Sequence, residues 1–300
     1  SFLLLKPTIA VVTNIDREHM NAYESFVDLL ASFKQFLDSV PFYGLSVLCV
    51  DDPYVCELLP EVRGRKLTYG FSPKAELQAT EVSHSMTGSR FHVSYNGKSL
   101  GEFTLPMFGN HVVQNALAAL GVALEFGIEV DVIRKAFSTL TGVKRRLEVV
   151  GEAFGCTVMS DYGHHPTEIQ ATLSALRAGW ANQLKDFRVI FQPHRYSRLQ
   201  DHYPDFCTAF GDCDRVYVTD VYAAGEEPRV GFSGEQLASD IVGPQALYVP
   251  DLEQACIQAC QEIGDGGLIL CLGAGSVGAL PPKVVQYLAS FETVERKALP

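Results

Sequence analysis

The stretch Asp161-Tyr162-Gly163-His164-His165-Pro166-Thr167-Glu168 joins two segments of different character. An apolar run, Cys156 to Met159, precedes it, and an amphipathic run, Ile169 to Leu176, follows it. This order predicts a strand, a polar loop and a helix, and α/β proteins bind ligands at such junctions. A similar polar run, Pro193 to Arg198, follows the next apolar run. We therefore expect one site, built at the ends of neighbouring strands.

The chain after Gly142 continues the same alternation of apolar and amphipathic runs, which predicts a doubly wound α/β domain over residues 143–300. The expected strands lie near residues 146–150, 156–159, 188–192, 215–219, 246–249 and 268–272. The expected helices lie near residues 167–178, 200–210, 233–241, 252–262 and 276–289.

Residues 1–142 predict a separate domain with a mixed sheet. Two strand-like runs, residues 8–13 and 45–50, flank a segment whose apolar residues recur at helical spacing, and this order predicts parallel pairing. Alternation on both sides of Asn96-Gly97 predicts an antiparallel hairpin. Two further helices are expected near residues 111–126, with Asn110 as the N-cap, and near residues 130–140.

Composition excludes some classes of function. The 300 residues carry 24 Lys and Arg against 35 Asp and Glu, a net charge of −11, which disfavours nonspecific nucleic-acid binding. No apolar run approaches the roughly 18 residues of a membrane span. The eight cysteines lack the spacing of a zinc site, and several lie in apolar runs, which indicates reduced thiols and the cytoplasm. The chain opens without Met, and we expect more sequence upstream.

The glycine run Gly273 to Gly278 matches G-x-G-x-x-G after a strand, but too little chain follows for the second half of a dinucleotide fold. We interpret it as a tight turn near a site. His164, His165 and Glu168 have three open interpretations: contacts to a phosphorylated ligand, a zinc site, or an ordinary polar turn before a helix.

Cationic groups cluster at two further places. Arg195 and Arg198 flank Tyr196 and Ser197, and guanidinium groups suit carboxylates and phosphates. Arg145 and Arg146 follow Lys144 at the expected domain boundary, where a plain charged linker is the alternative.

Two weaker signals lie in the first domain. His111 and Asn115 share a helix face, and an Asn amide suits the edge of a nucleobase, although capping or packing explains it equally well. His19 ends a loop with Asp16 and Glu18, a composition that suits Mg²⁺ only in part because Mg²⁺ prefers oxygen ligands.

Together these motifs resemble those of the Mur ligases, in the same order and over nearly the whole chain. The resemblance is carried by Asn14 to Met20, Gly109 to Asn115, Gly142 to Arg146, Asp161 to Glu168, Gln192 to Arg198, Asp220 to Glu226 and Gly273 to Ser276. It implies that residues 1–142 are the later part of a P-loop-type central ATPase domain and that residues 143–300 are the Rossmann-like C-terminal domain. A UDP-substrate domain and the P-loop are expected upstream, since no G-x-x-x-x-G-K-[ST] motif occurs here.

The resemblance also implies the activity: an ATP- and Mg²⁺-dependent ligase that joins L-alanine to UDP-N-acetylmuramate through an acyl phosphate. The alternatives are a ligase that recycles murein tripeptide and a fragment that binds nucleotide without turnover.

The resemblance assigns roles to individual residues. His19 is expected to bind magnesium, and the nucleotide is expected to contact His111, Asn115, Arg145, Arg146 and Asp161. The acyl-phosphate and amino-acid end is expected to involve His164, His165, His194, Arg195 and Arg198 in catalysis, with Tyr196, Tyr222 and Ala223 binding the substrate.

Overall fold

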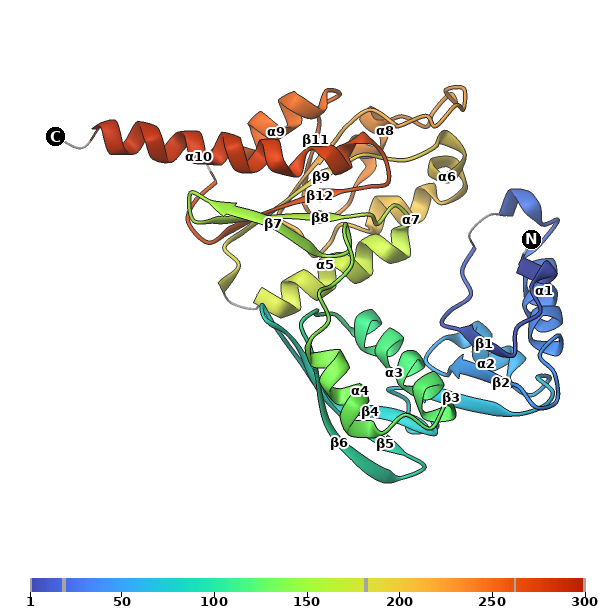
Figure 1. Ribbon diagram of the computed structural model, residues 1–300. Helices are drawn as coiled ribbons and strands as arrows, with labels where there is room; N and C mark the ends of the chain where they lie inside the picture. The colour runs from blue at the N-terminus through green and yellow to red at the C-terminus, as the bar shows by residue number, and fades with distance from the viewer. Residues whose placement is uncertain (1, 18–19, 181–182, 262, 299–300) are drawn as a thin grey trace. The chain divides into compact units, whose positions relative to one another are not determined.

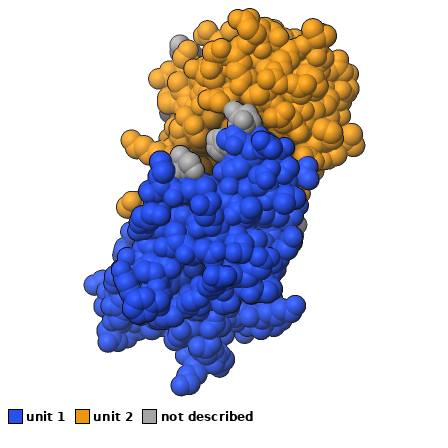
Figure 2. All heavy atoms as spheres, turned by 90° about the vertical axis from the view of Figure 1, so that its right-hand side faces the viewer, with its two compact units in different colours: residues 1–140 blue, residues 141–300 orange. Residues whose placement is uncertain are grey.

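A computed structural model describes residues 2–17, 20–180, 183–261 and 263–298. The chain divides into two compact units, Ser1–Leu140 and Thr141–Pro300 (Figure 2). Each unit is a six-stranded sheet covered by helices on both faces (Figure 1). No helix among the described residues is long and apolar enough to cross a membrane.

The sheet of the first unit has the strand order β1-β2-β3-β4-β5-β6. Strands β1 to β4 pair in parallel, and β4, β5 and β6 pair antiparallel, so the predicted mixed sheet is confirmed. The predicted hairpin is also present, with Asn96 and Gly97 both at positive φ, as a two-residue hairpin turn requires. The strands are Ile9–Val12, Leu45–Cys49, Lys66–Gly70, Leu77–Ser85, Gly88–Tyr95 and Lys98–Leu105.

Two apolar cores lie on opposite faces of this sheet. On one face, α1 and α2 pack around Leu48 and Val12. On the other, α3 and α4 pack around Val47, Phe91 and Phe103. The helices are α1 Phe26–Asp38, α2 Pro53–Leu58, α3 Asn110–Glu125 and α4 Val130–Ser138, with short 3₁₀ turns at Phe2–Leu4 and Met20–Ala22.

The prediction that Asn110 caps α3 was wrong. Gly109 occupies the cap position with a φ of 113°, which favours glycine, and Asn110 is the first helical residue. The Asn110 side chain instead lies with Oδ1 2.9 Å from Nε2 of His84, whose Nδ1 lies 2.9 Å from the Ser89 hydroxyl. This network joins the start of α3 to β4 and β5.

The sheet of the second unit has the strand order β11-β10-β9-β12-β8-β7. All pairs are parallel except β7 with β8 at the edge. In Figure 1, α9 and α10 cover one face and α5 and α7 cover the other, which is the predicted doubly wound arrangement. The strands are β7 Glu148–Ala153, β8 Cys156–Asp161, β9 Asp186–Phe191, β10 Arg215–Val218, β11 Gln245–Tyr248 and β12 Gly267–Leu272.

Two predicted helices had the wrong bounds, and proline explains both. The helix expected near residues 200–210 is split at His202 into α6 Tyr196–Asp201 and α7 Tyr203–Thr208, since Pro204 has no N–H to continue the hydrogen-bond ladder. The helix expected near residues 276–289 is a 3₁₀ turn, Ser276–Ala279, followed by α10 Pro281–Ala298. The remaining helices are α5 Pro166–Trp180, α8 Gly234–Asp240 and α9 Leu252–Cys260.

Arg188 is a buried cation in the centre of the second sheet, with only 1% of its side chain exposed. Its guanidinium donates to Asp186 Oδ2 from Nε at 2.9 Å and from Nη2 at 2.5 Å. Nη1 donates to the carbonyls of Ala259 and Gln261 at the end of α9, at 2.9 and 2.5 Å. One side chain thus pairs a carboxylate and satisfies two carbonyls that the helix leaves open.

We predict that Arg188→Ala lowers the free energy of unfolding of the second unit by about 3–5 kcal/mol, because Asp186 and two carbonyls lose their partner. Trp180 is the only tryptophan of the chain and lies buried in α5, so its fluorescence during denaturant unfolding reports this unit. Arg215→Ala, at the neighbouring position of β10 in the sheet register, is the matched control, with an expected loss within about 1 kcal/mol. Equal losses for the two variants would contradict the role given to Arg188.

Candidate active site at the carboxyl edge of the second sheet

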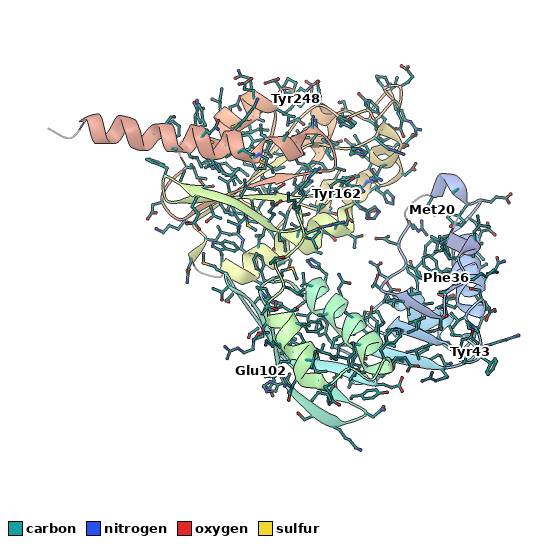
Figure 3. The ribbon with its side chains drawn as sticks, viewed as in Figure 1. Met20, Phe36, Tyr43, Glu102, Tyr162 and Tyr248 are labelled. Carbon is teal, nitrogen blue, oxygen red and sulfur yellow. The ribbon has the colours of Figure 1, made fainter. Side chains whose placement is uncertain are left out.

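Four loops meet at one edge of the second sheet. Strands β8, β9, β10 and β12 are parallel, so the chain leaves all four at the same edge. The double-histidine loop follows β8, the arginine loop follows β9, residues 219–232 follow β10 and the glycine run follows β12. Tyr162, labelled in Figure 3, lies directly beyond the carboxyl end of β8. The expectation that neighbouring strand ends bring these polar segments together is therefore met.

A row of rings from three of these loops forms the centre of the edge. The ring of His164 lies 5.2 Å from Tyr162 and 6.0 Å from His194. The ring of His194 in turn stacks on Tyr222 at 5.3 Å, with an angle of 12° between the planes. Tyr222 is 42% exposed, so the row opens to solvent on this side.

Hydrogen bonds place the ring proton on different nitrogens in the two imidazoles, on Nδ1 in His164 and on Nε2 in His194. Nδ1 of His164 lies 3.0 Å from the Tyr162 carbonyl oxygen, which only accepts, so Nδ1 carries the proton and Nε2 presents a lone pair. Nδ1 of His194 lies 3.2 Å from Nη1 of Arg198, which only donates, so Nε2 of His194 carries the proton. One ring therefore offers a base and its neighbour offers a donor.

His194 is held neutral by its surroundings. Burial lowers its pKa to about 4 from the ordinary 6.5, and the nearby charges of Arg198 and Arg195 act in the same direction. Arg198 also donates to the His194 carbonyl at 3.0 Å, which fixes the guanidinium beside the ring.

The two adjacent histidines have different surroundings. His164 is half-buried in the row of rings, whereas His165 is 5% exposed and its ring lies 4.4 Å from that of His202, edge to face. Glu168, the third residue of α5, accepts from the backbone amides of His164 at 3.0 Å and His165 at 3.4 Å. The structure therefore places His164 at the site edge and His165 in the interior.

Asp161 organises the loop that it begins. Its side chain is 3% exposed, and it accepts from the amides of Leu147 at 2.8 Å and Gly163 at 2.7 Å and from the Thr172 hydroxyl at 3.3 Å. Burial raises the pKa of this carboxyl above its ordinary value, and the backbone donors offset part of the effect. Its carboxylate oxygens are thus occupied within the protein.

Arg145 and Arg146 also differ in their surroundings. The Arg145 guanidinium lies 4.8 Å from the centre of the Tyr162 ring and donates to the Gly273 carbonyl at 2.5 Å. Arg146 is half exposed, lies 5.6 Å from the same ring and pairs with Glu168 at 3.7 Å. Of the two arginines, Arg146 is therefore the one whose charged group is exposed to solvent.

The glycine run packs too closely for side chains. A Cβ atom at Gly275 would lie 2.4 Å from Gln192 Oε1, and one at Gly278 would lie 2.3 Å from the Arg145 guanidinium carbon. Gln192, at the end of β9, also accepts from the amide of Val277 at 3.0 Å and bonds the Ser276 hydroxyl. The run is the tight turn expected from the sequence.

Family comparisons match both units. The model described as "Mur ligase middle domain" matches residues 1–123, and the model described as "Mur ligase, glutamate ligase domain" matches residues 145–275. The chain belongs to the Mur ligase family.

Curated members of the Mur ligase family are similar over most of this chain. It is 44% identical to a UDP-N-acetylmuramate–L-alanine ligase of Geobacter sp. (strain M21) over 92% of its residues, and 42% identical to that of Pelobacter propionicus over 92%. The matches span 60% and 61% of those two proteins, so the chain corresponds to about three fifths of their length.

Solved Mur ligase structures share the fold. The UDP-N-acetylmuramate-alanine ligase of Thermotoga maritima superposes with a TM-score of 0.75 at 23% identity, over 97% of this chain and 61% of that one. The MurF ligase of the same organism, solved in complex with ADP, gives 0.72 at 18% identity, over 98% of this chain and 64% of that one.

In the first unit of this Mur ligase chain, two nucleotide candidates lie on the first turns of α3. His111 is half-buried, and Asn115 is exposed one turn later. Between them, Gln114 donates from Nε2 to Asp51 at 2.7 Å, and Asp51 also accepts from the amides of Phe71 and Ser72. Asp51 therefore ties α3 to the carboxyl ends of β2 and β3.

His19, the expected magnesium ligand, lies outside the described residues. Within the described ranges, no group of three or more His, Cys, Asp or Glu side chains is placed to hold a metal ion. The zinc interpretation of His164, His165 and Glu168 therefore gains no support. Arg195 is exposed, and Tyr196 and Ala223 are half-buried around the arginine loop.

Sequence reasoning missed several residues that build the site. Tyr162, Gln192 and Glu226 contact the candidate residues, yet none of the three was assigned a role. Glu168 was considered as a ligand of a phosphate group or of zinc, but in the structure it accepts from the amides of His164 and His165. Glu168 had a detectable signal, since Glu at the third helical position often bonds back to amides before the helix. Glu226 and Gln192 act across loops, where spacing along the chain carries no such signal.

We predict that the imidazole of His194 stays neutral from pH 7 down to pH 5, with the proton on Nε2. Because its folded pKa is lowered to about 4 from 6.5, its contribution to stability is complete above pH 6.5 and is lost as the pH falls towards 4. Arg198→Met is expected to raise this pKa towards the ordinary value, whereas Arg229→Met in the next loop is the control. NMR titration of the ring nitrogens measures both, and a proton found on Nδ1 would contradict the assignment.

Proposed function

We propose that the protein containing this chain is an ATP-dependent ligase that joins L-alanine to UDP-N-acetylmuramate, a step in making peptidoglycan precursors in the cytoplasm. The observation that carries the proposal is the pair of neighbouring imidazoles beside Arg198, in which hydrogen bonds place a proton on Nδ1 of His164 and on Nε2 of His194. The identity of the substrates is supported by the curated relatives, which bear this name at 40–44% identity.

A carboxylate is a poor electrophile, so the reaction starts by activation. The lactyl carboxylate attacks the γ-phosphorus of ATP, ADP leaves, and an acyl phosphate forms. The amine of L-alanine then attacks the acyl carbon, and the tetrahedral intermediate breaks its bond to the phosphate oxygen. Phosphate leaves, and the amine loses a proton as the amide forms.

The residues at the sheet edge match this second half of the reaction. Nε2 of His164 presents the lone pair that accepts the proton of the attacking amine. Nε2–H of His194 donates to an anionic oxygen without adding a charge. Arg198 and the exposed Arg195 supply positive charge for the amino-acid carboxylate or the acyl phosphate.

The nucleotide is assigned to other residues. His111 and Asn115 on α3 are proposed to contact adenine, and Arg146 to approach the phosphates, because it is half exposed. Arg145 is held against Tyr162 and the Gly273 carbonyl, and we propose that it supports the loop. The assignment of Asp161 to the ribose stays a prediction, since its carboxylate is occupied by internal donors.

Mg²⁺, when bound, neutralises charge on the transferring phosphoryl group. His19 is proposed as one of its ligands.

The substrates are tested in the full-length protein that contains residues 1–300. We expect phosphate release only when UDP-N-acetylmuramate, L-alanine, ATP and Mg²⁺ are all present, measured by a coupled phosphate assay. Turnover with L-alanyl-γ-D-glutamyl-diaminopimelate in place of L-alanine would instead identify a tripeptide-recycling ligase. Residues 1–300 alone, which contain no P-loop motif, are expected to show no turnover, and measurable turnover by them would contradict the proposed dependence on a P-loop.

The proposed base is tested by substitution. His164→Ala is expected to lower kcat by roughly 10²- to 10⁴-fold, because the amine loses its proton acceptor. The KM for ATP is expected to stay unchanged. His92→Ala on β5, a half-exposed histidine that pairs with Glu81, is the control and should keep full activity. A His164→Ala enzyme with unchanged kcat would exclude this residue as the base.

A further inference from the structure

The residue at the start of α6 has an unfavourable backbone conformation and an unfavourable charge for its position. Arg195 occupies the N-cap position with φ 72° and ψ 134°, and no cap hydrogen bond is made by its side chain. A positive φ is strained for a residue with a side chain. A cation at a helix N-terminus also opposes the helix dipole, and Ser, Thr, Asp or Asn usually caps this position.

A residue in a second loop makes the helix-capping hydrogen bonds that the Arg195 side chain does not make. Glu226, in the loop after β10, accepts from the backbone amide of Ser197 at 2.8 Å and from the Ser197 hydroxyl at 2.6 Å, using one carboxylate oxygen for each. Ser197 is the second residue of α6, so this amide is one of those that the helix itself leaves without a partner. Glu226 therefore caps α6 from a different loop.

The same two loops are joined by backbone bonds. The Arg195 amide donates to the Tyr222 carbonyl at 2.9 Å, and the Tyr222 amide donates to the Pro193 carbonyl at 2.8 Å. The Glu226 amide donates to the Ala223 carbonyl at 3.0 Å, which turns the second loop back towards α6. Together with the Ser197 bonds, these contacts hold the strained residue from both sides.

The negative charge of Glu226 also stabilises the start of α6. Burial alone would raise the pKa of Glu226, but the two bonds from Ser197 and the charges of Arg195 and Arg229 outweigh it, and the pKa is lowered. The carboxylate is therefore ionised at neutral pH and offsets the cation that the arginine loop places at the helix start.

We propose that Glu226 is a positioning residue for the acceptor end of the site, because it caps α6 and holds Arg195, His194 and Arg198 in the conformation that meets the amino acid. The proposal rests on the proposed function. Glu226 contacts Ser197 in the structure and acts through the loop.

Three substitutions in the full-length protein test the proposal. Glu226→Ala removes both bonds and the charge. Glu226→Gln keeps the geometry, since its Oε1 accepts from the Ser197 amide and its Nε2 donates to the Ser197 hydroxyl, but it removes the charge. Glu227→Gln removes an exposed charge at the next position and is the matched control.

Kinetics provide the first measurement. We expect Glu226→Ala to raise the KM for L-alanine by roughly 10- to 100-fold, the effect of losing charge-assisted hydrogen bonds, with the KM for ATP unchanged. Glu226→Gln should recover most of this loss, and Glu227→Gln should match the wild type. An unchanged KM for L-alanine in Glu226→Ala, or equal changes for L-alanine and ATP, would overturn the proposal.

Limited trypsin digestion provides a measurement that does not need turnover. Cleavage after Arg195 and Arg198, followed by mass spectrometry, should be faster in Glu226→Ala than in the wild type, while the Trp180 unfolding midpoint changes little. Equal cleavage rates would overturn the proposal. If the wild type shows no ligase activity but cleavage is faster in the variant, the proposed function fails and the loop anchoring stands.

Discussion

Parallel pairing around β12 is the constraint on which the second unit depends. β12 lies between β8 and β9 and is buried along all six of its residues, so its backbone is satisfied only by these two neighbours. Parallel strands place all their carboxyl ends at one edge of the sheet, so the loop that follows each strand begins at that edge. The crowding of rings, guanidinium groups and tight glycines at this edge follows from the sheet.

Some residues in the loops at this edge are locally unfavourable, and hydrogen bonds from other parts of the chain stabilise them. Asp161 is a buried carboxylate, and amides from two segments satisfy it. Arg195 is a poor helix cap, and Glu226 replaces the missing bonds. Each of these residues is stabilised by hydrogen bonds from a different loop, so the conformation of any one loop depends on its neighbours. Such compensated strain is common where a protein binds ligands.

Much of the fold was predictable because its signals are local. The buried parallel strands are apolar runs, and Asn96-Gly97 permits the backbone that a hairpin turn needs. The split at His202 also has a local signal, because Pro204 lies inside the predicted helix and has no N–H to continue its hydrogen bonds. Within the site, periodicity does not tell which of His164 and His165, or of Arg145 and Arg146, turns inward. Long-range packing decides both, as His202 and Tyr162 show.

The contacts of Arg145 have a mechanical consequence. Its carbonyl accepts from the Tyr162 amide at 2.7 Å, its amide donates to Glu148 at 2.7 Å, and its guanidinium lies on the Tyr162 ring. From Arg145 onwards the backbone is thus clamped to the body of the second unit. The first residues of the second unit, which begins at Thr141, are therefore anchored to the edge of their own sheet before its first strand begins at Glu148.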